Sequence, residues 1–86
     1  MGGQLPGRVM FPKAKEPFDG SADQSVAFNN RMYGLYLSND GAADLTVEVN
    51  GETFTVKAGK EFREYFDPFN AVDITATDDY HGYGLG

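Results

Sequence analysis

The sequence of 86 residues contains no cysteine and only one histidine, His81. A chain without cysteine forms no disulfide and offers neither a thiolate metal ligand nor a thiol nucleophile. A single histidine cannot build a histidine-rich metal cage. Small proteins often need such staples because their cores are thin. We therefore expect stability to come from a well-packed monomer or from association, and we favour association.

Long apolar runs and basic clusters are also missing. The apolar stretches span only a few residues, far fewer than the roughly 20 that cross a bilayer. No basic segment followed by an apolar run marks a signal peptide, so we expect use without secretion. Thirteen acidic residues against seven basic ones give a net charge of −6. Because such a chain repels phosphates and anionic lipids, we expect neither nucleic acid nor a membrane as partner.

Helical periodicity is absent as well, and short alternating runs separated by turn residues take its place. This pattern predicts an all-β fold, a small antiparallel β-sandwich or partly open barrel of six to seven short strands. We expect one domain over residues 1–86, with residues 1–7 as a flexible N-terminal arm. The predicted strands are 25–28, 31–39, 45–49, 52–56, 61–66, 71–77 and 80–85, and residues 8–11 are compatible with an edge strand.

Turn and loop residues separate these predicted strands. Residues 13–24 have loop composition, with a turn at 19–21. Asn29-Asn30 is interpreted as a turn, and residues 67–70 are interpreted as a break that includes Pro68. Residues 31–39 are apolar on both faces, which favours a central position in the sheet. Small residues at Gly82 and Gly84 should let another backbone or ring approach the last strand closely.

The most informative segment is a hairpin centred on Asn50-Gly51. This dipeptide between two alternating runs is the strongest short-range hairpin signal. A two-residue loop fixes the register, so turn chemistry and apolar pattern predict the same pairing independently. The expected cross-strand pairs are Val49 with Glu52, Glu48 with Thr53, Val47 with Phe54, Thr46 with Thr55, Leu45 with Val56 and Asp44 with Lys57.

No motif for catalysis or metal binding emerges. The aspartates lack the spacing of a twelve-residue calcium loop, so turn formation and solvation explain them better. His81 has no cysteine or Gly-x-Ser-x-Gly serine to activate, and we interpret it as structural or surface-exposed. The glycines of residues 82–86 precede no helix, and a helix N-terminus is what binds phosphate in glycine-rich loops. We predict no enzyme, with no catalytic residue, cofactor or metal.

Aromatic side chains form the one ambiguous group. Several of the seven phenylalanines and five tyrosines gather late in the chain. We expect most phenylalanines in the core and the tyrosines nearer the surface, because their hydroxyls need water or a partner. One hypothesis is a carbohydrate-binding or adhesion module, with Tyr65, Tyr80 and Tyr83 as a coplanar, exposed stacking platform.

Residues 37–86 resemble small β-sandwich proteins of tailed bacteriophages and prophages, of the capsid decoration, head-fibre or tail accessory type. The resemblance rests mainly on turn and hairpin motifs: Asn39-Asp40-Gly41, Leu45-Thr46-Val47, Val49-Asn50-Gly51, Phe54-Thr55-Val56, Phe66-Asp67-Pro68-Phe69, Thr75-Ala76-Thr77 and Gly82-Tyr83. Gly84 stands where such sequences usually have a β-branched residue. The family carries no catalytic residues.

This resemblance implies a non-enzymatic virion structural protein that is made in the host cytoplasm. Its partners would be other virion proteins or copies of itself, with many copies in one assembly. The edges of an open sandwich can accept a strand from a neighbour. Our candidate interface residues are Leu5, Val9, Met10, Phe11, Tyr65, Phe69, Tyr80 and Tyr83. The carbohydrate-binding module is the alternative.

Overall fold

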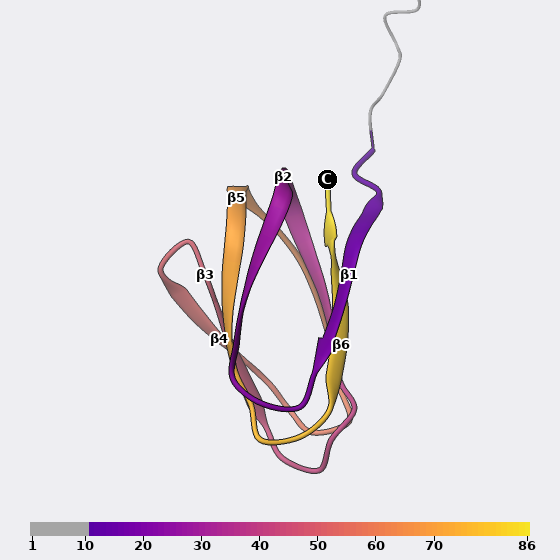
Figure 1. Cartoon of the computed structure of the whole chain (residues 1–86), viewed down its shortest axis with the longest axis vertical. Coiled ribbons are helices and arrows are strands. Elements are labelled where there is room, and N and C mark those ends of the chain that lie inside the picture. The colour runs from indigo at the N-terminus through magenta and orange to yellow at the C-terminus, as the bar shows by residue number, and fades with distance from the viewer. Residues whose placement is uncertain (1–10) are drawn as a thin grey trace, which may run out of the picture.

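The computed structural model describes residues 11–86 (Figure 1). Within this range the chain forms six β-strands and no helix, which confirms the predicted all-β class. No segment of the described chain is a helix that could cross a membrane. The strands are β1 (Ala14–Gly20), β2 (Gln24–Asn39), β3 (Leu45–Val49), β4 (Glu52–Val56), β5 (Glu61–Thr75) and β6 (Tyr80–Leu85).

All six strands belong to one antiparallel sheet with the order β1-β6-β2-β5-β3-β4. The two longest strands, β2 and β5, have 16 and 15 residues and run through a bend (Figure 1). Their outer halves pair with each other at 24–27 and 71–74, next to β3 and β4. Their other halves pair next to β6 and β1. The sheet thus folds back on itself as two layers, like a small sandwich or open barrel.

The bend of β2 lies where we predicted a chain reversal. Asn29 and Asn30 belong to the strand, and the pairing register with β5 shifts between Ala27 and Met32. The carboxylate of Glu16 accepts hydrogen bonds from the backbone N–H groups of Asn29 (2.7 Å) and Asn30 (3.1 Å). Because a side chain satisfies these amides, the strand bends there without ending. The predicted turn at 29–30 is therefore wrong.

Residues 67–70 are likewise part of a continuous strand, so the predicted break in β5 is wrong. Pro68 lacks an N–H group, and it lies in the part of β5 that crosses the bend. The predicted loop at 13–24 is also wrong up to Gly20, because β1 occupies an edge of the sheet. Pro17 falls at a register shift between Lys15 and Phe18, the position at which an edge strand tolerates proline.

The β3–β4 hairpin confirms five of the six predicted cross-strand pairs, whereas the sixth, Asp44 with Lys57, lies beyond the strand bounds and does not form in the ladder, and the Asp44 carboxylate instead accepts the N–H of Ala58. Its five pairs run from Leu45 opposite Val56 to Val49 opposite Glu52, as expected. Asn50 and Gly51 have φ values of 53° and 81°, the left-handed conformation that a tight two-residue hairpin turn requires. The last strand, β6, also has its predicted bounds.

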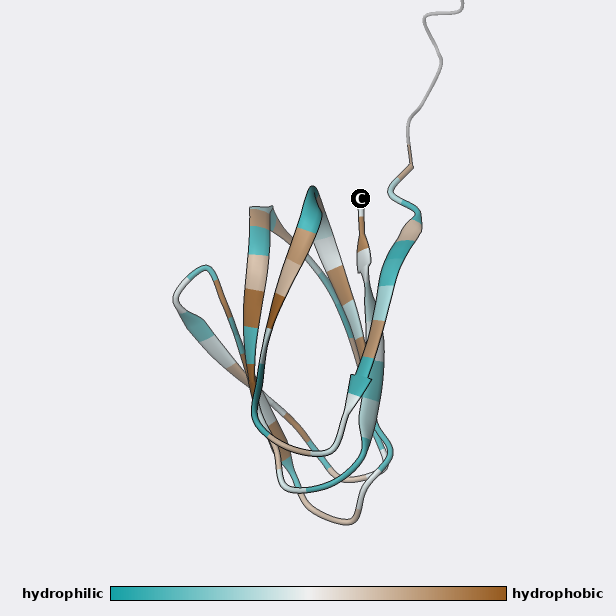
Figure 2. Ribbon diagram, in the orientation of Figure 1, coloured by the Kyte–Doolittle hydropathy of each residue, from teal (hydrophilic) through white to brown (hydrophobic). Residues whose placement is uncertain are grey.

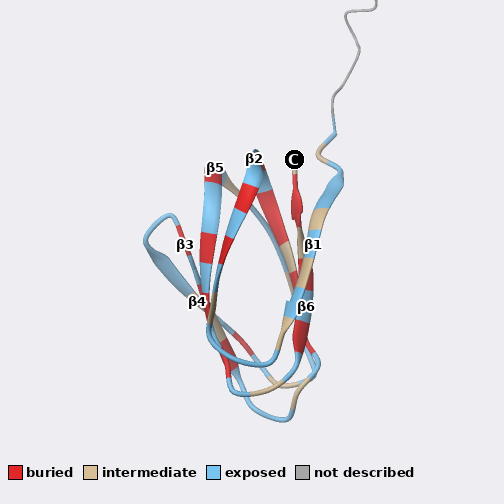
Figure 3. Cartoon of the chain, viewed as in Figure 1, coloured by how far each residue is buried: buried red, intermediate tan, exposed pale blue. Residues whose placement is uncertain are grey.

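The core lies between the two layers of the folded sheet. Buried and exposed residues alternate along the strands (Figure 3), and the apolar residues follow the same alternation (Figure 2). The fully buried positions include Met32, Leu35, Leu37, Val47 and Ile74. Phe18, Phe54, Phe62 and Phe66 pack against this core while partly exposed. These residues leave little room for a deep internal cavity.

Candidate functional site

Of the eight predicted interface residues, three have side chains that reach the surface, and three lie outside the described residues. Phe11 and Tyr65 are 73% and 58% exposed, and Tyr83 is partly buried. The remaining three, outside residues 11–86, are Leu5, Val9 and Met10. The predicted flexible arm, 1–7, lies outside that range too.

The other two predicted interface residues lie in the core, so their assignment to an exposed surface is wrong. Phe69 is 4% exposed and packs edge-to-face against Phe28 and Phe66 at the bend of β5. Tyr80 is 2% exposed, and its hydroxyl donates a hydrogen bond to the backbone oxygen of Ala22 over 2.7 Å. A backbone oxygen between β1 and β2 therefore satisfies the hydroxyl that we expected to need water.

The outward face of β6, β2 and β5 carries a pair of stacked tyrosines. Tyr36 lies opposite Tyr83 on β6, with ring centroids 4.7 Å apart and planes 21° from parallel. The Tyr36 hydroxyl donates to the Glu61 carboxylate over 3.0 Å. Desolvation raises the pKa of Tyr36, and the nearby Glu61 carboxylate raises it further. Each of the two rings therefore stacks one of its faces on the other ring.

The platform that we predicted from Tyr65, Tyr80 and Tyr83 does not form, since Tyr80 is buried. Sequence reasoning missed Tyr36 as a member of this face. Its pairing with Tyr83 depends on the register between β2 and β6, which lie far apart in the sequence, so local patterns do not reveal it. We call the outward side chains of Tyr36, Tyr83, Glu61, Arg63 and His81 the polar face.

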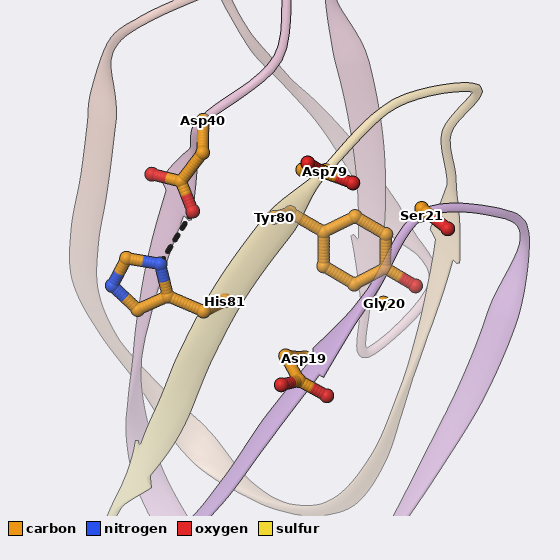
Figure 4. Close-up of a pocket in the computed structure, with 7 residues that line it drawn as sticks. All are labelled: Asp19, Gly20, Ser21, Asp40, Asp79, Tyr80 and His81. Atoms are coloured by element: carbon orange, nitrogen blue, oxygen red, sulfur yellow. Dashed lines mark hydrogen bonds and ion pairs between the residues drawn. The ribbon is translucent and has the colours of Figure 1, made fainter.

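Ser38, Asp40 and His81 form a hydrogen-bonded trio at one end of the polar face, and Figure 4 shows its Asp40–His81 pair. His81 Nδ1 is 2.5 Å from Asp40 Oδ2, and Ser38 Oγ donates to Asp40 Oδ1 over 2.8 Å. The hydrogen bond from His81 holds the pKa of Asp40 below its ordinary value of 3.8, and the Ser38 bond adds to this. Asp40 and His81 line a shallow hollow of about 430 Å³, together with Asp19, Gly20, Ser21, Asp79 and Tyr80.

This trio has the wrong connectivity for nucleophilic catalysis. A serine is activated when a histidine accepts its proton and a carboxylate orients that histidine. Here the Ser38 hydroxyl donates to the carboxylate itself. In Figure 4 the carboxylates of Asp19 and Asp79 point away from the Asp40–His81 pair. No group of three or more His, Asp or Glu side chains in the described chain is placed to hold a metal ion.

A second surface feature is the gap between β4 and the first half of β5. Within residues 11–86, β4 pairs only with β3, and residues 61–69 pair only with β2. Between these strands lie the partly buried rings of Phe54, Phe62 and Phe66. Phe54 is 5.4 Å from Phe62 and 5.5 Å from Phe66 by ring centroids. We call this gap, with its three rings, the seam.

The seam is closed at both ends and open along its length. Residues 57–60 join β4 to β5 at one end, and at the other the Asn50 amide donates to the backbone oxygen of Asp67 over 2.9 Å. Near that bond lies a hollow of about 260 Å³, lined by Val49, Asn50, Glu52, Phe54, Phe66 and Asp67.

The seam has the physical properties of a protein-docking site. A strand edge with unmatched N–H and C=O groups is a template for pairing with another chain, and natural proteins usually protect such edges. The β1 edge carries Pro17 and a bulge as protection. In the described part of β5, residues 61–67 form an edge that has no proline and borders a half-buried apolar cluster. Strand addition beside such a cluster buries the rings and pairs the backbone.

The chain was compared with protein-family models, with curated proteins and with solved structures, and none of them matches it.

Proposed function

We propose that the protein is a non-enzymatic structural protein of a virion, of the capsid decoration, head-fibre or tail accessory type. It is made in the host cytoplasm and is present in many copies on the particle. Its partners are other virion proteins or copies of itself. The observation that carries this proposal is the seam, an open strand edge beside the rings of Phe54, Phe62 and Phe66. A domain this small gains stability when a large assembly holds it.

Two further features favour docking over catalysis or sugar binding. The Ser38 hydroxyl is bonded to Asp40 and not to His81, so the trio lacks the serine–histidine hydrogen bond of a nucleophilic triad. The sugar-stacking platform expected from Tyr65, Tyr80 and Tyr83 does not form, because Tyr80 is 2% exposed. A glycan-binding role, the alternative, therefore has less support from the geometry than protein docking.

The test is to quantify the chain by mass spectrometry in gradient-purified virions from the organism that encodes it. We expect many copies per particle, and absence of the chain from the particles would refute the proposal. Phe54→Glu places a charge in the seam and should reduce incorporation at least tenfold. Ser21→Glu adds the same charge at an exposed position between β1 and β2, so it is the matched control and should leave incorporation unchanged. Circular dichroism of both variants checks that each is folded.

A further inference from the structure

We propose that the seam binds residues 8–11 of a second copy of this chain, Arg8-Val9-Met10-Phe11, as an added β-strand along the edge of β5. This inference rests on the proposed assembly function and names its partner segment. Four observations lead to it: the open edge, the charge distribution along the chain, the pattern of residues 8–11 and the position of β1.

The receiving edge is the stretch Glu61–Asp67 of β5. Its other side pairs with β2, from Ser38 opposite Glu61 to Gly34 opposite Tyr65. Alternate backbone groups of this stretch therefore point away from β2, and no strand of the described chain pairs with them. Phe62 and Phe66 are partly exposed beside this edge and contact Phe54 across the seam. An added strand with apolar side chains would cover these rings.

Charge is divided unevenly between the start of the chain and the rest. Residues 1–15 contain three basic residues and no acidic one, a charge of +3. Residues 16–86 contain four basic and thirteen acidic residues, a charge of −9. The exposed acidic residues Glu52, Glu64 and Asp67 lie on the strands that border the seam. Opposite charges steer association, so the basic start of one copy is attracted to the acidic body of another.

Residues 8–11 have the pattern and length of a short strand. Val9 and Phe11 alternate with Arg8 and Met10, so two apolar side chains share one face. Pro12 follows and has no backbone N–H group, so hydrogen-bond donation to a neighbouring strand ends at this residue. Four extended residues span about 13 Å, comparable to the five-residue β4 strand. Phe11 is 73% exposed in the isolated chain, which leaves its ring free to bind elsewhere.

The geometry favours a second copy over the chain's own seam. Lys13 and Gly86 exchange two backbone hydrogen bonds of 2.9 and 3.0 Å, which fixes the chain beside the end of β6. From there, the far edge of β5 lies about three strand spacings away, or about 14 Å. Two residues reach at most about 7 Å, so Phe11 cannot enter its own seam. Figure 1 shows β1 and β4 on opposite sides of the molecule.

Sedimentation equilibrium of the full chain tests the self-association. We expect concentration-dependent oligomers that weaken with added salt, because the attraction is partly electrostatic. Val9→Asp introduces a charge into the apolar face of the segment and should weaken association at least tenfold. Gln4→Asp adds the same charge outside residues 8–11 and should associate within about twofold of the wild type. A chain that stays monomeric at millimolar concentration would overturn the proposal.

Disulfide trapping tests the contact between residues 8–11 and the seam directly. Because the sequence has no native cysteine, only the introduced cysteines can form a disulfide. The Val9→Cys variant is mixed with Glu64→Cys, at the seam, or with Asp19→Cys, on β1 at the other end of the strand order. We expect the disulfide-linked heterodimer with Glu64→Cys to form at least tenfold faster than the one with Asp19→Cys. Equal rates would refute the contact while leaving the virion role intact. Selective trapping of a chain that is absent from virions would refute the virion role alone.

Discussion

Gly82 leaves no space for a side chain between β6 and the neighbouring strand β2. A methyl group at this position would collide with the backbone oxygen of Tyr36 and would lie 2.8 Å from the Phe18 ring. At Gly84 the nearest atoms would be the side chain of Met32, with its sulfur 2.6 Å away. Backbone atoms of a paired strand cannot retreat, whereas an unbranched methionine can change rotamer. The two glycines therefore differ in how much they constrain the fold.

We predict that Gly82→Ala destabilises the protein by about 2 kcal/mol or more, because the new methyl group forces the two strands apart. Gly84→Ala should cost about 1 kcal/mol or less, since Met32 can yield. Urea denaturation followed by circular dichroism measures both values. A larger loss for Gly84→Ala than for Gly82→Ala would contradict the packing described for β6.

The Asp40 carboxylate offers a second prediction at this scale. Its pKa is lowered first by the hydrogen bond from His81 and then by that from Ser38. We expect His81→Ala to raise the pKa of Asp40 toward 3.8, and Ser38→Ala to raise it by a smaller amount. An NMR titration of the Asp40 carboxyl carbon reads the pKa directly. A larger rise in the Asp40 pKa for Ser38→Ala than for His81→Ala would show that Ser38, and not His81, is the main cause of the lowered pKa.

At the scale of elements, the sequence predicted those features that depend only on residues close together in the chain. The hairpin register followed from Asn50-Gly51 and the flanking alternation, which need no distant contact. The continuity of β2 could not be predicted in this way. Asn29-Asn30 has turn composition, but the Glu16 carboxylate, 13 residues before Asn29, binds both amides. Only the folded arrangement of β1 beside this bend brings the two together.

Because Glu16 titrates, its stabilising contribution at the bend of β2 depends on pH. The N–H of Asn29 is the main cause that holds the pKa of Glu16 below its ordinary value of 4.5, against opposing desolvation. A lowered pKa means that the unfolded chain binds the proton more tightly. The stabilising contribution of Glu16 is therefore complete above about pH 4.5 and is lost as the pH falls through the folded-state pKa.

We predict that Glu16→Gln lowers the Tm by a few degrees at pH 7 and reduces the fall in Tm between about pH 6 and pH 3. The amide accepts fewer hydrogen bonds than a carboxylate and does not titrate. Thermal melts across this pH range measure both effects. Glu52→Gln, on an exposed position of β4, is the control and should follow the wild-type profile. An unaltered acid dependence in Glu16→Gln would contradict the role of this carboxylate.

At the scale of the whole molecule, burial decides which aromatic residues are available to a partner. The late cluster of rings in the sequence contains core and surface members that composition does not separate. Phe69 is buried at the bend of β5, Tyr80 is buried at the start of β6 between β1 and β2, and Tyr65 is 58% exposed. The seam was also beyond local reasoning, since it depends on the order β5-β3-β4 and not on any single segment.

We predict that Phe69→Ala costs about 3–4 kcal/mol of stability, because it leaves a cavity beside Phe28 and Phe66. Phe11→Ala should change the stability of the monomer by less than about 0.5 kcal/mol, since the ring is exposed. Chemical denaturation at concentrations too low for association measures both values. A small loss for Phe69→Ala would return that residue to the list of interface candidates.

The sharing of β2 and β5 between both layers links the two halves mechanically. Neither layer can open alone, because each would have to pull the same two strands out of the other. Amide protons in the paired stretches of β2 and β5 should then exchange with deuterium only when the entire chain unfolds, all with one free energy. The β3–β4 hairpin, which is attached to the rest of the sheet through three residue pairs of β3, should exchange sooner.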